Sequence, residues 1–311
     1  SDNLLSLFNQ TNNESFIVDK LRRYNILSNF HEVSQGLIPY DKYRGHDEHT
    51  IKNRIWHSTY QKDETFKKEL KGGDVNRYLI NWNGMLWISY GQWLAAPRKP
   101  EFFNNERILV REILSDKLYC GYTKEEYYNT PSCINIIDTK KILDLRFTLC
   151  ILNSKLIGWY VKKVSPKANK GLFPKILVND VRNIPMIEIN KNAQIVFIEK
   201  ADSMFSLNKE FQEHDQKFQR TLERKFSLTQ LPKKLQDWYL LSYTDFIKEL
   251  EKKKIKLSLS EEAEWETYFS TEAKKALELK AQITQTDKEI DQMVYALYEL
   301  TEDEIKIVEE S

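Results

Sequence analysis

The chain has 311 residues, of which 41% are hydrophobic and 30% are charged, a composition typical of a globular protein of about two domains that excludes a disordered chain. The formal net charge is +1, but residues 1–185 carry +8, residues 186–311 carry −7, and residues 257–311 alone carry −10. The basic first part suits a domain that binds a polyanion, whereas the acidic tail suits contacts with protein or solvent.

The first part of the chain predicts short elements separated by loops. Helices are expected at Glu14–Tyr24 and at Lys62–Lys71, the latter ending at Gly72 and Gly73. Strands are expected at Phe30–Ile38, Leu86–Ser89, Ile108–Ile113, Tyr119–Tyr122 and Cys133–Ile137. Thr139–Val164 contains an apolar run that predicts a buried helix, with Asn153-Ser154-Lys155 as its cap or hinge. A basic loop, Ser165–Phe173, and extended runs at Pro174–Val178 and Asn183–Ile187 follow.

The second part predicts long helices. Apolar residues recur at helical spacing from Leu207 to Phe226, and His214 on this stripe is expected to be a satisfied interface histidine. Leu235–Leu250 predicts one or two more helices. Capping boxes begin at Ser258 and Thr301. A heptad seam of Phe269, Ala276, Ile283, Ile290 and Leu297 indicates packing within the chain or with a partner.

Glycine and proline mark the boundary between the two parts. All nine glycines lie at or before Gly171, and seven of the eight prolines lie at or before Pro185. We therefore predict an α+β protein with three segments. These are a linker or helix over residues 1–29, a mixed, loop-rich domain over residues 30–190, and a mostly α-helical region over residues 191–311.

Several classes of function leave no signature in this sequence. No apolar run is long enough to span a membrane, and no signal peptide is visible. Three widely spaced cysteines favour a reducing cytoplasm over a disulfide framework or a zinc site. Motifs for nucleotide binding, zinc proteases and serine hydrolases are lacking, so we predict no catalytic residue. His46, His49 and His57 have spacings that a metal site can use, but a solvated loop is the better interpretation.

The stretch Lys71–Ile113 mixes aromatic and basic residues. Trp82, Trp87, Tyr90 and Trp93 alternate with arginines and lysines, a combination that suits either a half-buried sheet or a surface that faces nucleic acid. We expect the tryptophans, Trp159 included, to be core residues, since reading a duplex needs no exposed ring.

A series of motifs in a fixed order carries a family resemblance. The motifs are Gln35-Gly-Leu-Ile-Pro-Tyr-Asp-Lys-Tyr-Arg-Gly45, Leu70-Lys-Gly-Gly-Asp-Val-Asn-Arg-Tyr78, Trp87-Ile-Ser-Tyr-Gly91, Leu94-Ala-Ala-Pro-Arg98, Phe102–Ile113, Leu152-Asn-Ser-Lys155, Phe173-Pro-Lys-Ile, Ile184-Pro185 and the tail Asp287–Glu304. Together they resemble the target-recognition (TaqI-like C-terminal specificity) domain and helical tail of adenine-N6 DNA methyltransferases, in particular the fused type IIG restriction–modification enzymes.

The resemblance implies a division of labour. The specificity domain grips double-stranded DNA and chooses the sequence, while an upstream methyltransferase domain binds S-adenosylmethionine and flips the target adenine. No residue of this chain matches the catalytic or cofactor motifs. We therefore expect a C-terminal fragment that holds no cofactor and whose partners are duplex DNA and the missing methyltransferase or nuclease domains of the same polypeptide. S-adenosylmethionine is expected for the parent enzyme, with Mg²⁺ and DNA cleavage left open.

Four loops of the first domain are the candidate DNA-binding sites, because lysine and arginine bind phosphates while arginine, asparagine, glutamine and lysine read base edges. The candidates are Lys42, Tyr43, Arg44 and His46; Lys71, Gly72, Gly73 and Arg77; Tyr90, Gln92, Arg98 and Lys99; and Lys162, Lys163, Lys167, Asn169 and Lys170.

Two other interpretations stay open. The chain can be a protein-interaction or scaffolding module that uses the heptad seam. It can also be an independent specificity subunit of the type I kind, although such subunits usually carry two tandem recognition domains and no internal repeat is visible here.

Overall fold

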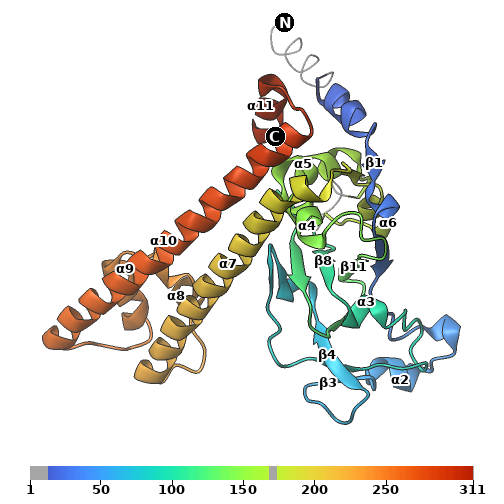
Figure 1. The fold of residues 1–311 in the computed structure, drawn as a ribbon. Helices are drawn as coiled ribbons and strands as arrows, with labels where there is room; N and C mark the ends of the chain where they lie inside the picture. The colour runs from blue at the N-terminus through green and yellow to red at the C-terminus, as the bar shows by residue number, and fades with distance from the viewer. Residues whose placement is uncertain (1–12, 168–173, 311) are drawn as a thin grey trace, which may run out of the picture. The chain divides into compact units, whose positions relative to one another are not determined.

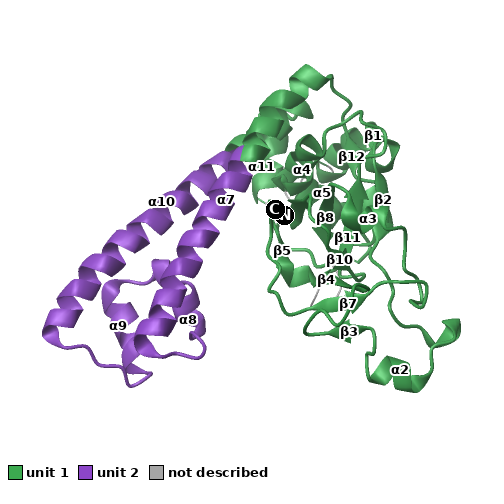
Figure 2. Ribbon diagram, turned by 60° about the horizontal axis from the view of Figure 1, so that its bottom comes forward, with its two compact units in different colours: residues 1–202, 289–311 green, residues 203–288 purple. Residues whose placement is uncertain are grey.

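The computed structural model describes residues 13–167 and 174–310 (Figure 1). Packing divides the chain into two units: unit 1 consists of residues 1–202 and 289–311, and unit 2 of residues 203–288 (Figure 2). Helices and several small sheets are both present, so the predicted α+β class is confirmed. The domain boundaries that we predicted at 29/30 and 190/191 remain predictions.

The elements up to residue 190 are mostly short. A helix covers residues 13–21 of the described chain. After it come β1 (Asn25–Ile26), η1 (Leu27–Asn29), β2 (Glu32–Gln35), η2 (Lys42–Arg44), α2 (Glu48–Lys52), β3 (His57–Ser58), β4 (Phe66–Leu70), η3 (Gly72–Asp74), β5 (Val75–Asn76), β6 (Leu79–Ile80), β7 (Trp87–Ser89), α3 (Glu101–Asn104), β8 (Arg107–Arg111), β9 (Cys120–Thr123), β10 (Tyr128–Asn129), β11 (Cys133–Ile137), α4 (Leu145–Asn153), α5 (Lys155–Val164), α6 (Val178–Arg182) and β12 (Pro185–Met186).

One antiparallel sheet, in the order β2-β11-β8-β9, lies at the centre of unit 1. Every residue of β11 is buried, as expected of a central strand covered on both faces. The guanidinium of Arg107 in β8 is fully buried and donates to the carbonyl oxygens of Asn105, Glu125 and Tyr127. The predicted strands at 86–89, 108–113, 119–122 and 133–137 are confirmed to within two residues at either end.

A second sheet has the order β10-β4-β7-β3, and the candidate loop 90–99 follows its strand β7. Strand β4 runs antiparallel to β7, with Phe66 opposite Ser89 and Lys68 opposite Trp87, and parallel to β10. The helix predicted at Lys62–Lys71 is therefore wrong. Its residues favour helix in isolation, but pairing on both edges and burial of Phe66 and Leu70 outweigh that preference.

The apolar run before residue 165 forms two helices rather than one. Ser154 separates α4 from α5, and its hydroxyl oxygen accepts from the backbone N–H of Ile157, which confirms the predicted cap. The buried Asn153 side chain donates to the carbonyl of Cys120 and accepts from its N–H. Asn153 thus continues the hydrogen bonding of β9 into the helix end, which fixes the register of helix and sheet.

The remaining elements are mostly helical. They are α7 (Lys191–Phe226), α8 (Lys233–Gln236), η4 (Trp238–Leu240), α9 (Tyr243–Glu251), α10 (Leu259–Leu297) and α11 (Glu302–Glu310). Both predicted capping boxes are present, with Glu261 accepting from the N–H of Ser258 and Glu304 from the N–H of Thr301. Of the helices in the described ranges, none combines the length and the apolarity needed to cross a membrane.

Unit 2 is built around an aromatic core. Trp238 is fully buried and stacks on Phe218 with ring centroids 3.6 Å apart, and its indole N–H donates to Asp215. His214 is buried and lies 3.0 Å from the carbonyl oxygen of Glu272, so its prediction as a satisfied interface histidine is confirmed. The heptad residues Phe269 and Ala276 belong to the same core.

Candidate nucleic-acid interface

The structure joins two of the four candidate loops, residues 41–46 and 90–99, into one surface, called here the recognition face. The guanidinium of Arg44 donates to the carbonyl of Ala95 at 2.6 Å. The imidazole Nε2 of His46 lies 2.9 Å from the carbonyl oxygen of Trp93. Two segments nearly 50 residues apart in sequence are therefore held together by side chains that the sequence analysis assigned to DNA.

Tyr90 and Arg98 shape the second of these loops. The half-buried ring of Tyr90 packs on Tyr128 with centroids 4.6 Å apart, and its hydroxyl donates to the carbonyl of Arg98. Burial raises the pKa of Tyr90, so this hydroxyl stays protonated and keeps donating. Arg98 has a left-handed backbone conformation (φ 63°) and its Nε lies 3.4 Å from the carbonyl of Gly36. We infer that Tyr90 positions the loop.

Trp93 departs from the expectation that the tryptophans are core residues. Trp93 is 39% exposed, and the centroid of its ring lies 5.9 Å from that of Trp56. A Cβ atom at Gly91 would lie 2.3 Å from the ring of Trp93, so the indole folds back over this glycine and would have to move to admit a larger residue. Trp159, by contrast, is 3% exposed, as predicted, and Trp82 and Trp87 are half-buried. The Gly-x-Trp spacing was the available signal for a ring held at the surface.

What the recognition face offers to a ligand is a set of exposed polar and aromatic groups on a fixed backbone. Tyr43 is 85% exposed, with the ammonium of Lys42 4.8 Å from its ring centroid. Gln92 and Lys99 are also exposed, and the ammonium of Lys99 lies 3.9 Å from the carboxylate of Glu32. An amide, a phenol and ammonium groups can donate to base edges and phosphates, and the amide and the phenol can accept as well.

The Gly-Gly loop lies elsewhere. β4 and β7 run antiparallel, so the last residue of one strand lies beside the first residue of the other. The Gly-Gly loop follows β4 and Tyr90 follows β7, so the two loops lie at opposite ends of this strand pair. The N–H of Lys71 donates to the carboxylate of Asp74, whose pKa is raised by burial. A carboxylate placed in the turn opposes a phosphate there. Arg77 donates to the carbonyl of Asn153, so it braces α4 rather than extending into solvent.

The fourth candidate group is divided among internal contacts and undescribed residues. Lys162 binds Asp116 at 2.9 Å, and this hydrogen bond lowers the pKa of Asp116. Lys163 pairs with Glu14 at 2.8 Å. Lys167 is exposed. The remaining candidates, Asn169 and Lys170, lie outside the described residues.

The three histidines considered for metal binding do not converge. His57 is in β3 rather than in the solvated loop we expected, with Nδ1 2.8 Å from the hydroxyl of Tyr40 and Nε2 3.5 Å from the carboxylate of Glu69. His49 is exposed and His46 holds the loop of Trp93. Within residues 13–167 and 174–310, no cluster of three or more His, Cys, Asp or Glu side chains is placed to hold a metal ion.

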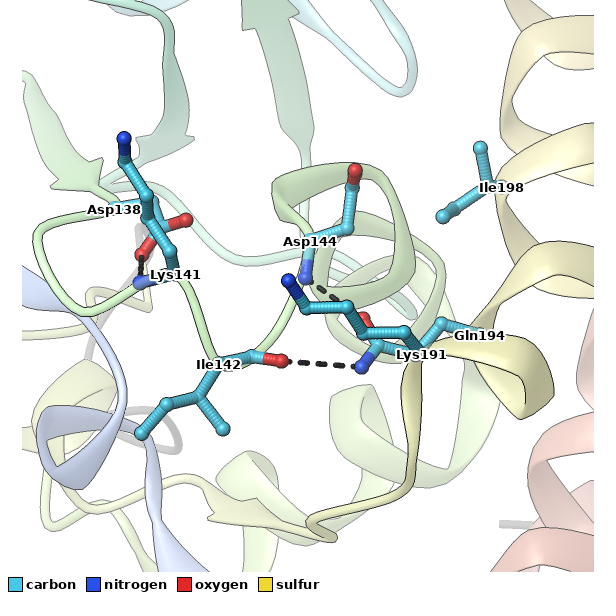
Figure 3. Close-up of a pocket in the computed structure, with 7 residues that line it drawn as sticks. All are labelled: Asp138, Lys141, Ile142, Asp144, Lys191, Gln194 and Ile198. Atoms are coloured by element: carbon cyan, nitrogen blue, oxygen red, sulfur yellow. Dashed lines mark hydrogen bonds between the residues drawn. The ribbon is translucent and has the colours of Figure 1, made fainter.

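A pocket of about 240 Å³ lies where α7 begins, lined by Asp138, Lys141, Ile142, Asp144, Lys191, Gln194 and Ile198 (Figure 3). The side chain of Gln194 occupies its wall. The amide donates to the carbonyls of Ile142 and Ile189 and accepts from the N–H of Asp144. These bonds attach the start of α7 to the segment before α4, so the polar groups of this wall serve the fold.

The sequence in this part of unit 1 matches a family model. The model is described as the TaqI-like C-terminal specificity domain, and the match covers residues 67–186, from β4 to β12. Residues 67–186 are a TaqI-like C-terminal specificity domain. The second candidate loop, 90–99, lies inside this specificity domain, whereas the first, 41–46, precedes it. A second model, a domain of unknown function (DUF8810), matches residues 190–294.

Solved structures of restriction–modification proteins are similar to between 61% and 84% of this chain at low identity. A type I restriction–modification S subunit from M. genitalium shares 13% identity with a TM-score of 0.37, over 65% of this chain and 43% of that one. The type IIG restriction endonuclease BpuSI shares 9% with a TM-score of 0.40, over 61% and 28%. The type IIL enzyme MmeI, solved in complex with DNA, shares 10% with a TM-score of 0.38, over 84% and 36%.

This chain therefore spans less than half the length of each of these three proteins. Among curated proteins, none matches the sequence.

Proposed function

We propose that the chain recognises a specific sequence in double-stranded DNA, and that the recognition face of residues 41–46 and 90–99 carries this activity. The supporting observation is geometric. Two loops that the sequence separates are joined by Arg44 and His46, inside and beside a specificity domain, and leave Tyr43, Gln92 and Lys99 exposed on a fixed backbone.

A fixed backbone is what sequence reading requires. Hydrogen bonds to base edges discriminate only when the donor and acceptor positions are set before the DNA arrives, since a mobile side chain adapts to the wrong base. Lys42 and Lys99 supply charge for phosphates, which gives affinity and orientation. Gln92 carries a donor and an acceptor side by side on one planar amide, and it is the residue expected to distinguish bases.

The chain is proposed to be the specificity part of a restriction–modification adenine-N6 methyltransferase. S-adenosylmethionine, with Mg²⁺ open, is proposed for methyltransferase or nuclease domains outside this chain, because no residue here matches their motifs. A cytoplasmic location belongs to the same proposal, since its three free cysteines are buried thiols suited to a reducing compartment. A scaffolding role through the heptad seam is less supported, because its residues Phe269 and Ala276 are already buried in unit 2.

Selection from a pool of randomised duplexes tests the function. The full chain is expected to enrich one sequence, and fluorescence anisotropy is expected to show tighter binding to it than to a scrambled duplex. Replacing Gln92 by Ala should reduce the difference in binding free energy between the selected and the scrambled duplex by about 1–3 kcal/mol if the amide reads one base pair. Lys99→Ala should weaken binding to both duplexes alike.

The matched control is Gln212→Ala, a change of the same type on α7, which should alter neither affinity nor ratio. A chain that binds no duplex even at low salt, or binds all sequences equally, contradicts the proposal.

A further inference from the structure

The acidic second part of the chain conceals a basic segment. Residues 217–256 contain 11 lysines and arginines and 5 aspartates and glutamates, a net charge of +6 between an acidic stretch before it and the −10 of residues 257–311. The segment comprises the end of α7, α8, α9 and the turns that join them, and within unit 2 these elements lie beside one another (Figures 1 and 2). The net charge of −7 over residues 186–311 therefore does not reveal that residues 217–256 are basic.

Most of these cations are not neutralised by the fold. All eleven are exposed. In this fully described stretch, seven have no carboxylate within ion-pair distance: Lys217, Arg220, Arg224, Lys233, Lys253, Lys254 and Lys256. Two others, Lys234 and Lys252, share the single carboxylate of Glu249 at 3.6 and 2.7 Å. Their common partner places α8 next to the turn that follows α9, so lysines from two elements meet on one side of unit 2.

The turn after α9 holds a lysine where the backbone favours glycine. Lys254 has φ 61°, and the N–H of Ile255 donates back to the carbonyl of Leu250, the arrangement with which many helices end on a left-handed glycine. A lysine side chain makes this conformation less favourable than glycine does. The fold therefore does not require a lysine at this position.

We propose that the end of unit 2, formed by the basic segment 217–256 and centred on Lys253, Lys254 and Lys256, binds the phosphate backbone of duplex DNA without reading its sequence. This inference extends the proposed function, since the ligand is the DNA that the recognition face binds. Flexible ammonium groups without fixed partners suit phosphates, because they act as point charges and tolerate any sequence.

Duplex DNA fits this surface better than a membrane does. The apolar residues exposed in unit 2 include Leu240 and Leu259, but an interfacial helix needs a continuous apolar face beside its cations. α9 instead turns Phe246 and Leu250 into the aromatic core. A basic surface without a continuous apolar face is suited to bind a soluble polyanion such as duplex DNA.

Fluorescence anisotropy on the full chain, with a duplex that contains the selected site, tests this. The variant Lys253→Gln/Lys254→Gln/Lys256→Gln is expected to bind more weakly. The slope of log affinity against log salt should become shallower by roughly 0.9 for each phosphate contact removed, up to about 2.7. The ratio between selected and scrambled duplexes should not change. The control Lys209→Gln/Lys274→Gln/Lys306→Gln removes the same charge from exposed helix positions that each pair with a glutamate four residues on, and should leave the slope unchanged.

A single change separates charge from folding. Lys254→Gly fits the left-handed backbone and is expected to melt at the same or a higher temperature while binding DNA more weakly with a shallower salt slope. Equal slopes for the triple variant, its control and the unchanged chain would overturn the inference while leaving sequence preference, and so the proposed function, intact. Loss of binding to phosphatidylserine vesicles with unchanged DNA affinity would also overturn it. Failure of the unchanged chain to prefer any duplex would instead count against the proposed function.

Discussion

The two units place positive charge in different ways. On the recognition face of unit 1, the arginines donate to backbone carbonyls, Arg44 to Ala95 and Arg98 to Gly36, and thereby hold loops in place. At the end of unit 2, Lys253, Lys254 and Lys256 project from a turn without carboxylate partners in that described stretch. A guanidinium can be part of the scaffold because its planar fork bonds carbonyls, whereas an ammonium on a flexible stem with no carboxylate in reach stays available to solvent and to phosphate.

This difference teaches that counting basic residues does not locate a reading surface. Several cations predicted to touch DNA, such as Arg77 and Lys163, make internal contacts with Asn153 and Glu14. Specificity is expected where loops are fixed and polar groups are exposed, and general affinity where charge is exposed and mobile. Three further predictions test how far the two units can be separated.

The largest effect is expected from Trp238→Ala, which removes the centre of the unit 2 core. Loss of its stacking with Phe218 and of its buried ring should cost about 3–5 kcal/mol of stability. Hydrogen exchange should rise across residues 203–288 and much less across β8 and β11. If the comparison holds, DNA affinity and the salt slope fall while the ratio between selected and scrambled duplexes is kept. Loss of that ratio would show that reading depends on unit 2.

A smaller effect is expected from acid and acts through a histidine of unit 1. His31 is 1% exposed, and burial lowers its pKa from 6.5 to about 4, with Asp138 opposing that shift. In the unfolded chain His31 is protonated below pH 6.5, whereas in the folded chain it stays neutral down to about pH 4. The free energy of unfolding therefore falls as pH decreases through this window. The loss should approach on the order of 3 kcal/mol, measured by urea unfolding.

Replacing His31 by Gln should flatten this pH dependence, because the amide can still bond the hydroxyl of Thr148, which lies 2.8 Å from Nε2. His49→Gln, at an exposed position, is the control and should retain the full dependence. An unchanged pH profile in His31→Gln would assign the acid sensitivity to other groups.

The smallest effect is expected from Gly91→Ala. The added Cβ would meet the far end of the Trp93 ring, which can swing away, so stability should change little. The displaced indole should alter tryptophan fluorescence and weaken binding to the selected duplex by about 1 kcal/mol, in the lower range for one lost base contact. Gly73→Ala meets open space and should leave binding unchanged. Equal affinity of the two variants for the selected duplex would show that Trp93 does not contribute to DNA binding.

The elements that could be predicted are those with a strong local signal. β11 matches its prediction at both ends because four of its five residues are apolar, three of them isoleucines, and they form a buried central strand. The capping boxes at Ser258 and Thr301 also form as predicted, since a cap involves residues only three apart. β4 was mistaken for a helix because its state depends on β7 and β10, which lie far along the chain.

The candidate site divides in the same way. Sequence order identified the specificity domain and the residue types of its loops, since those are local properties of the chain. It did not show that loops 41–46 and 90–99 meet, that Arg77 turns inward, or that Trp93 is exposed over Gly91. Each of these depends on contacts between segments distant in sequence, and no local pattern contains that information.

The sequence by itself determined the α+β class, the helical second part and the kinship of residues 67–186, because periodicity, turn residues and motif order are written along the chain. The tertiary structure alone decided which cations serve as scaffold and which remain available to a ligand. A charge becomes a scaffold only when folding brings a carbonyl or carboxylate to it. For Arg44 that partner is 51 residues away, and for Lys254 none of the described residues supplies a carboxylate.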